Sequence, residues 1–438
     1  MSSEVESKLW LAYASKLKNV ISGPGGLGEN QRFYFAPLSY AGIPAGGSIP
    51  DAIKNQGIYQ IADTLLDWDS PAFGSSTESY FARMDLYSSW IKLNEGKVQE
   101  EYEVVYDKAY ERWEKEWDRK ITEDKFWDWI ANGSYPKLLQ AKKARDSASA
   151  ATLLALGEVD GPEAEIVGQY KRNLDNARDS NKHPGYNMPC SRASAKQIQG
   201  KNYNTKDEFL KPAYDISAQY EDTISNWVQT FPEHQKQPKS FTFTVKDAEA
   251  TKWSNLGYQE SNVDVSGRAC IFFRASYTEN NKQVVKEIRE VKHSSDLEVT
   301  VTMTDLGTFA VNPSSMWNPS QLKSLNLRDD IPEKLKKPYG VVTEVVLAYG
   351  VGLTIKLSTA DSEEIHEYME KARQTKGSVS FCGWNIGLGG SVDSNNTSTT
   401  TFDDVKRHDS GTVITIPPSD NAYPTLIAAI GTRFQLEN

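Results

Sequence analysis

The sequence predicts an α+β protein, with a mainly helical N-terminal domain over residues 1–235 and a C-terminal antiparallel β-sandwich or open barrel over residues 236–438. Helical periodicity dominates up to about Val228, and two-residue alternation dominates after it. A Pro/Gln/Lys-rich segment, residues 231–239, separates the two patterns. The 438 residues exceed what one hydrophobic core usually serves, so two domains are the default expectation.

The N-terminal half carries apolar residues at the spacing of one helix face. Pro50 opens the second such stretch at a first helical position, where the missing N–H of proline does no harm. Gly157 and Pro162 mark the end of one helix and the start of the next. Helices are expected over residues 4–20, 50–68, 137–156 and 162–178.

An aromatic series lies within the polar segment over residues 77–130, at steps of three or four residues. Its members are Tyr102, Tyr106, Tyr110, Trp113 and Trp117. One helix face holds all five rings, and charged residues cover the rest. This predicts a helix that buries its rings against neighbouring helices. An aromatic wall for a planar ligand is the alternative, since Tyr and Trp combine an apolar ring with a polar end.

The C-terminal half alternates between apolar and polar residues, as strands with one buried face do. One helix interrupts it near residues 361–373, with Asp361 as the expected cap. With so few crossover helices, the strands should pair antiparallel. Strands are expected over residues 241–245, 269–273, 297–303, 341–357, 379–392, 413–416 and 426–434.

The longest alternating run, residues 341–357, is the most distinctive feature of this half. Every odd position is apolar or Thr, and the run far exceeds the about five or six residues of an ordinary strand. Its other face carries only small residues in the middle, at Ala348, Gly350 and Gly352, which predicts that another part of the protein or a ligand packs closely there. Gly350 and Gly352 are therefore candidate ligand or interface positions.

Two structures fit this run. A membrane-inserting, pore-forming hairpin needs one apolar face and strict alternation of apolar and polar residues. Alternatively, the glycines bend the strand, so that each half serves a different part of a soluble sheet. The second run, residues 379–392, changes register between Phe381 and Trp384, and a bulge at Cys382–Gly383 is the expected cause. This slip favours the bent, soluble sheet.

The segment from His183 to Cys190 carries the strongest functional signal among the loops, because it combines two prolines, a glycine, a histidine and a cysteine. His183 and Cys190 are the candidate catalytic pair, since an imidazole in reach of a thiol activates it. Tyr186 and Asn187 are candidate ligand or interface residues. A structured connection between helices is the other interpretation.

No cofactor or metal is expected. Residues 23–28 fit the G-x-G-x-x-G pattern of dinucleotide sites, but they follow a predicted helix instead of a strand, so they predict a turn. No cluster of histidine, cysteine and carboxylate residues has the spacing of a zinc or calcium site.

Composition limits the compartment and the partners. The chain has 49 Lys and Arg against 59 Asp and Glu and no long basic cluster, so nucleic-acid binding lacks its electrostatic basis. Three cysteines argue against a disulfide framework. Glu4, Glu6 and Lys8 interrupt the apolar run that a signal peptide needs, and no stretch approaches the roughly eighteen apolar residues of a membrane span. We expect a cytoplasmic protein.

The expected function is that of a non-enzymatic binding, self-assembling or membrane-active protein of the toxin or defence type. A helical half followed by a Ser/Thr/Gly-rich β half is broadly similar to the layout of some two-part toxins. Its expected partners are further copies of the chain, membrane lipid or a small apolar ligand. The alternative is an enzyme of small-molecule, specialised metabolism with a pocket between the helical and β domains.

Overall fold

The computed structural model confirms the α+β class, with helices and antiparallel sheets. Contacts divide the chain into two compact units: a sheet unit of Met1–Ser79, Gly185–Pro313 and Pro338–Phe434, and a helical unit of Tyr80–Pro184, Ser314–Lys337 and Gln435–Asn438. The structure describes residues 4–22, 27–36, 42, 43, 45, 51–76, 78–88, 90, 95–116, 123–147, 214–265, 271–314, 318, 331–387, 401–407, 412–418 and 424–434.

The described strands of the sheet unit form three antiparallel sheets, as the alternation predicts. The first contains, in spatial order, β1 (Gln31–Phe35), β15 (Thr425–Phe434), β9 (Tyr339–Tyr349), β8 (Asp305–Pro313) and β3 (Tyr214–Ile216), and β2 (Leu65–Asp67) pairs with the start of β9. The second contains β13 (Lys406–Arg407), β14 (Val413–Ile416), β10 (Gly352–Lys356), β7 (Glu298–Met303) and β4 (Lys239–Thr244). The third contains β12 (Trp384–Gly387), β11 (Ser378–Phe381), β5 (Phe273–Glu279) and β6 (Lys282–Ile288).

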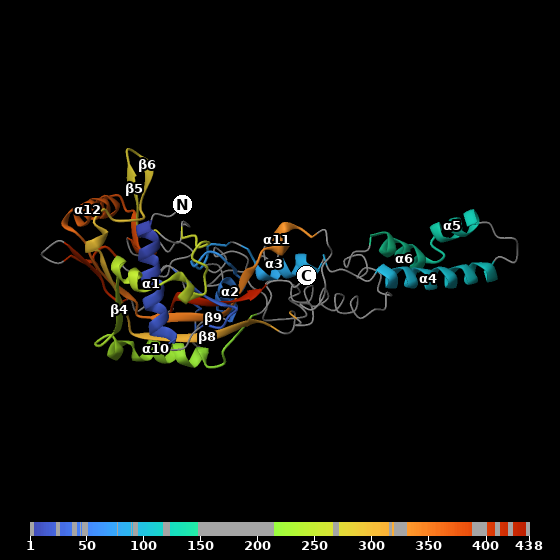
Figure 1. Cartoon of the computed structure of the whole chain (residues 1–438), viewed down its shortest axis with the longest axis horizontal. Coiled ribbons are helices and arrows are strands. Elements are labelled where there is room, and N and C mark those ends of the chain that lie inside the picture. The colour runs from blue at the N-terminus through green and yellow to red at the C-terminus, as the bar shows by residue number, and fades with distance from the viewer. Residues whose placement is uncertain are drawn as a thin grey trace, which may run out of the picture. The chain divides into compact units, whose positions relative to one another are not determined.

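The long alternating run is a bent strand. It divides into β9 and β10 at Gly350, whose φ is +55°, and the two halves belong to the first and second sheets. β8 and β7 run beside them and divide at Thr304, which donates both its N–H and its hydroxyl to the carbonyl of Tyr349. Figure 1 shows β8 and β9 side by side. The prediction that glycine bends this strand, so that each half serves a different part of the sheet, is confirmed.

Close packing explains the bare face at the bend. A Cβ atom on Gly350 would lie 2.6 Å from the ring of Phe231, which belongs to α10 (Tyr220–His234). A Cβ atom on Gly352 would lie 2.8 Å from the hydroxyl oxygen of Thr302 on β7. A helix and a neighbouring strand therefore occupy the space that the small residues leave.

The first helix packs against strands of two sheets. α1 (Glu4–Ser22) crosses the strands of the sheet unit in Figure 1. Trp10 stacks on Phe35 of β1 with 5.0 Å between the ring centres. Tyr13 packs against Phe241 and Phe243 of β4, so α1 contacts both the first and the second sheet. Short 3-10 helices, η1 (Val245–Ala250) and η2 (Trp253–Leu256), contact α1 as well.

The predicted boundary near residue 235 lies within the sheet unit, between α10 and β4. As a boundary between domains it stays a prediction.

The second helix is shorter than predicted. α2 (Asp51–Ala62) ends before Leu65, because residues 65–67 form β2 and pair with β9. Strand pairing thus overrides the helical pattern that continues to Trp68 in the sequence.

The predicted bulge at Cys382–Gly383 is wrong. Cys382 and Gly383 have φ values of +47° and +84° and form a two-residue turn between β11 and β12, with Phe381 opposite Trp384. Positive φ at both turn residues is typical of tight hairpins, which match the twist of the strands they join. The change of register in the sequence is therefore a reversal of the chain.

The helix near residue 361 is α12 (Thr359–Gln374), and its cap is Ser358 instead of Asp361. The Ser358 hydroxyl accepts the N–H of Asp361, three residues on. Asp361 lies in the first turn, and its carboxylate has other partners, described below.

The helical unit confirms the buried aromatic face. Its described helices are α3 (Tyr80–Ser88), α4 (Glu95–Glu116), α5 (Glu123–Ala131), α6 (Pro136–Ser147) and α11 (Glu333–Lys336). Tyr102 and Trp113 of α4 pack with Phe126 and Trp129 of α5, and Tyr106 and Tyr110 border the cluster. Trp117 lies outside the described residues. The ring series thus forms a core, as predicted.

Phe126→Ala should destabilise the helical unit by about 3–5 kcal/mol, since the ring is fully buried and its removal leaves a cavity. Urea unfolding followed by circular dichroism measures the loss. Val104→Ala on α4 is the control, because Val104 is 51% exposed and should change stability by less than about 0.5 kcal/mol. Equal effects of the two variants would contradict the role of this core.

Candidate functional site

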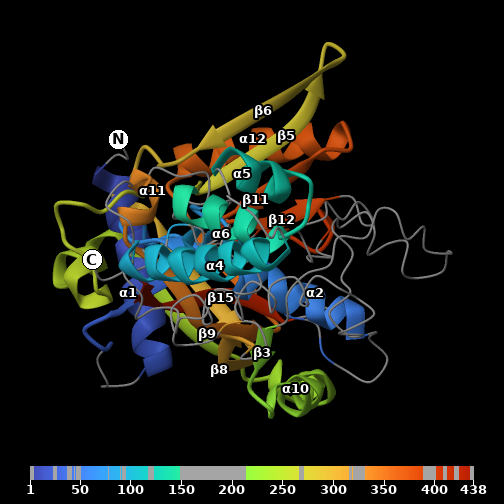
Figure 2. The same ribbon diagram turned by 90° about the vertical axis from the view of Figure 1, so that its right-hand side faces the viewer.

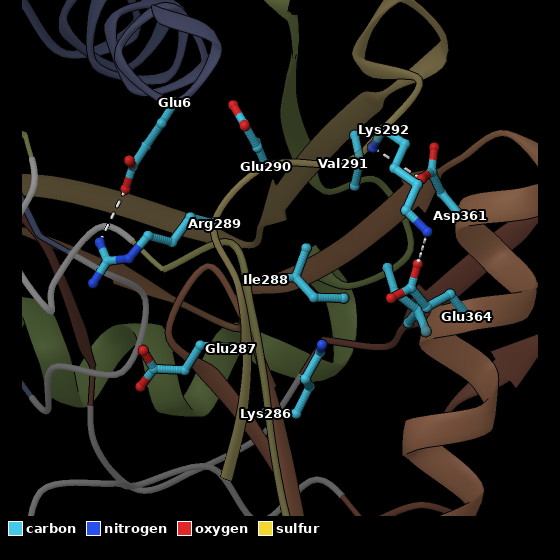
Figure 3. Close-up of a pocket in the computed structure, with 11 residues that line it drawn as sticks. Glu6, Lys286, Glu287, Ile288, Arg289, Glu290, Val291, Lys292, Asp361 and Glu364 are labelled. Carbon is cyan, nitrogen blue, oxygen red and sulfur yellow. Dashed lines mark hydrogen bonds and ion pairs between the residues drawn. The ribbon is translucent and has the colours of Figure 1, made fainter. Parts of the chain in front are cut away.

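A pocket of about 430 Å³ lies in the sheet unit beside the C-terminal end of β6. The first turns of α1 and α12 form its other walls (Figure 3). Charged side chains dominate the lining, with Ile288, Val291 and Ile365 as the apolar part. The charged residues are Glu6, Lys286, Glu287, Arg289, Glu290, Lys292, Asp361 and Glu364.

Two ion pairs join the walls of the pocket. Arg289 Nη1 lies 3.1 Å from Glu6 Oε1, and the Glu6 side chain is only 2% exposed. Lys292 Nζ lies 2.6 Å from Glu364 Oε2, and this carboxylate raises the pKa of Lys292. The segment after β6 is therefore held to α1 on one side and to α12 on the other.

Asp361 binds the backbone of the same segment, the residues that follow β6. Its Oδ1 accepts the N–H of Lys292 at 3.0 Å, and its Oδ2 accepts the N–H of His293 at 3.0 Å and the hydroxyl of Ser358 at 2.7 Å. The residue is 4% exposed. Burial alone would raise the pKa of Asp361, but the hydrogen bonds from Ser358, His293 and Lys292 lower it below its usual range. Asp361 is therefore ionised at neutral pH.

Ser358, His293 and Asp361 are the residue types of a hydrolytic triad, but their geometry is that of a helix cap. In a triad the imidazole bridges the other two residues through its two different nitrogens. Here both the Ser358 hydroxyl and the Asp361 carboxylate lie 3.3 Å from the same atom, His293 Nδ1. The Ser358 hydroxyl also bonds to Asp361 directly. His293 thus pairs with Asp361 at the start of α12.

The remaining side chains of the pocket alternate along β6. In Figure 3, Ile288 points towards α12, whereas Glu287 and Arg289 point the other way. Glu287 lies 3.8 Å from Arg274 Nε, and Lys286 Nζ lies 5.4 Å from the centre of the Tyr368 ring. The pocket is thus a set of paired charges on three elements, suited to hydrogen-bonded or ionic contacts with a polar partner.

A second charged pocket, of about 440 Å³, lies near the bend of the sheet. His234 Nδ1 at the end of α10 lies 2.9 Å from Asp305 Oδ1, the first residue of β8. Lys236 and Lys239 contribute to the lining. The sequence carries no signal for this pair, because 71 residues separate its members.

The predicted site residues have different outcomes. His183, Tyr186, Asn187 and Cys190 lie outside the described residues. Gly350 and Gly352 lie at the bend, where Phe231 and Thr302 fill the adjacent space, and a ligand or interface role for either glycine stays a prediction.

Among the other candidate groups, Cys382 is buried in its hairpin turn. Burial raises the pKa of its thiol to about 12, so it is protonated at neutral pH and a poor nucleophile. Within the described residues, no three His, Cys, Asp or Glu side chains are grouped as metal ligands would be. None of the described helices combines the length and apolar character needed to cross a membrane.

Comparison with known protein families, curated proteins and solved structures gives no match to this chain. Its function must therefore be inferred from its own geometry.

Proposed function

We propose that this protein is a non-enzymatic binding and self-assembling protein, of the toxin or defence type, that acts through the face of the sheet unit carrying the pocket beside β6. The observation that supports this most is the pairing of the charges in the pocket. Glu6 with Arg289 and Lys292 with Glu364 join α1, the segment after β6 and α12. Such pairing holds a polar surface in one geometry before a partner arrives, which reduces the ordering that binding requires.

Catalysis needs different properties from the same groups. A general acid or base works best with a pKa near the operating pH and with reach to a substrate proton. Asp361 instead has a lowered pKa, and both of its carboxylate oxygens already accept hydrogen bonds from backbone N–H groups and from Ser358. The alternative enzymatic function rests on His183 and Cys190, outside the described residues, and stays a prediction.

Size-exclusion chromatography with light scattering tests self-assembly. We expect a molar mass above that of one chain, which rises with protein concentration. A mass of one chain over the whole accessible range of concentration and pH contradicts the proposal.

Dye-loaded liposomes test the membrane-active form of the proposal. Leakage that appears only at concentrations where the protein assembles would support action on lipid. Assembly without leakage at any pH restricts the proposal to binding and self-assembly.

A further inference from the structure

Among the described strands, β6 forms one edge of the third sheet. β6 comes last in the order of the third sheet, and no described strand pairs with its far side. Its hairpin with β5 closes with a two-residue turn at Asn280–Asn281, so Glu279 and Lys282 form a hydrogen-bonded pair. From Lys282 onwards, every second residue of β6 forms a hydrogen-bonded pair with β5. Gln283, Val285 and Glu287 therefore direct their backbone N–H and C=O groups away from β5. Figures 1 and 2 both show the hairpin projecting beside α12.

The side chains on these three residues lie on the exposed face of the strand. Val285 is 45% exposed, one of the few large apolar side chains in the described residues that are so open. Gln283 and Glu287 flank it at equal distance along the strand. Gln283 donates to Ser276 through Nε2, which still leaves it a second amide hydrogen. Val284, Lys286 and Ile288 take the other face, where Lys286 lies over Tyr368 of α12.

We infer that β6 pairs with β6 of a second copy of this chain, antiparallel and centred on Val285, an inference that rests on the proposed self-assembly. A two-fold axis at Val285 places the two Val285 side chains opposite each other. It also places the amide of Gln283 opposite the carboxylate of Glu287 in the other copy, twice. The two four-stranded sheets then form one sheet of eight strands.

The strand pattern selects this register. Only odd-numbered residues present backbone groups at the edge, so odd residues must lie opposite odd residues, and a two-fold axis can pass through any residue from 283 to 287. Centring on Val284 opposes Lys282 with Lys286, and centring on Lys286 opposes two copies of that lysine. Centring on Glu287 opposes two carboxylates, and like charges directly opposite destabilise a strand pair. Centring on Gln283 leaves Val285 opposite Asn281 of the turn. Centring on Val285 opposes no like charges, since Lys282 meets Ile288 and Lys286 meets Val284.

A cysteine at the axis tests the register directly. In Val285→Cys the two thiols of a pair lie on opposed residues, within the Cα separation that a disulfide spans. We expect mild oxidation to link two chains, whereas Val228→Cys should not be linked, although Val228 of α10 is similarly exposed at 39%. Equal cross-linking of the two variants overturns the inference.

Light scattering on lysine variants separates this inference from the proposed function. Val285→Lys places two like charges at the axis and should weaken association at least ten-fold, while Val228→Lys should leave it unchanged. Gln283→Lys should strengthen it, because each lysine then faces Glu287 of the other copy. If the native protein assembles and all three variants assemble equally well, the β6 interface is wrong and self-assembly stands. If the native protein stays a single chain at every concentration, both the β6 interface and the proposed self-assembly are wrong.

Discussion

Gly350→Ala should destabilise the sheet unit by about 2–5 kcal/mol. A residue with a Cβ atom at the φ of +55° found here costs about 1–2 kcal/mol. The added atom would lie 2.6 Å from the Phe231 ring and 2.7 Å from Thr304 Oγ1, and overpacking of this kind costs about 1–3 kcal/mol more. Neither neighbour can withdraw freely, because Phe231 packs edge-on against Tyr349 and the Thr304 hydroxyl bonds to the Tyr349 carbonyl.

Gly133→Ala isolates the backbone contribution. Gly133 has a φ of +82° and no atom within 4 Å of a Cβ, so its replacement should cost only about 1–2 kcal/mol in the helical unit. Urea unfolding of both variants measures the difference. A Phe231→Ala background should reduce the cost of Gly350→Ala, since it removes the nearest ring. If both glycine variants lose the same stability, crowding at the bend is not what requires glycine there.

The bend could be predicted because it leaves a trace in local sequence. Alternation on one face of residues 341–357, with small residues on the other, indicates both the strand and the place where it cannot stay straight. What fills the space could not be predicted. Phe231 is more than a hundred residues away, and its own neighbours in the sequence read only as a helix followed by a linker.

The reversal at Cys382–Gly383 shows a different limit. Both a bulge and a two-residue turn change which positions face the core, so the register slip alone does not distinguish them. Cysteine is also unusual at a turn position with positive φ, where Asn, Asp or Gly are common. The sequence therefore predicts one bulged strand over residues 379–392, where the structure has the two strands β11 and β12.

The candidate pocket could be predicted only in part. The sequence predicts a helix that starts at Asp361, and the structure confirms a helix there, although it begins at Thr359 and its cap is Ser358. The backbone partners of the Asp361 carboxylate lie 68 and 69 residues earlier, in a segment that shows no special pattern. The convergence of α1, β6 and α12 is a property of the tertiary fold, which local periodicity does not encode.

Asp361→Ala should destabilise the sheet unit by about 2–4 kcal/mol at neutral pH. The substitution leaves the N–H groups of Lys292 and His293 without their acceptor in a site where Asp361 is 4% exposed. Unsatisfied buried donors cost about 1–3 kcal/mol each, and solvent that enters the vacated space recovers part of this. Urea unfolding at neutral pH measures the loss. The stability of Asp361→Asn, which keeps one acceptor oxygen, should lie between that of the native protein and that of Asp361→Ala.

The loss should depend on pH in one direction. The pKa of Asp361 is lower in the folded protein than in the unfolded chain, so its ionised form stabilises the fold. That contribution is fully present above the unfolded pKa of about 3.9 and disappears as the pH falls through the lower folded value. The native protein should therefore be more stable than Asp361→Ala by a constant amount between about pH 5 and 7, and the gap should narrow below about pH 4.

Asp404→Ala is the matched control for this effect. Asp404 also has a lowered pKa, caused by the N–H and the hydroxyl of Thr401, each 2.7 Å from its Oδ2. Asp404 is exposed, however, and its partner lies three residues away, so its loss should cost only about 0.5 kcal/mol. A large loss of stability at Asp361 and a small one at Asp404 would show that burial and the link to the segment after β6 stabilise the fold. Hydrogen bonds to a residue three positions away would then not be enough to explain the loss. Equal effects, or a loss at Asp361 that persists unchanged at pH 3, would mean that its carboxylate does not hold the pocket together.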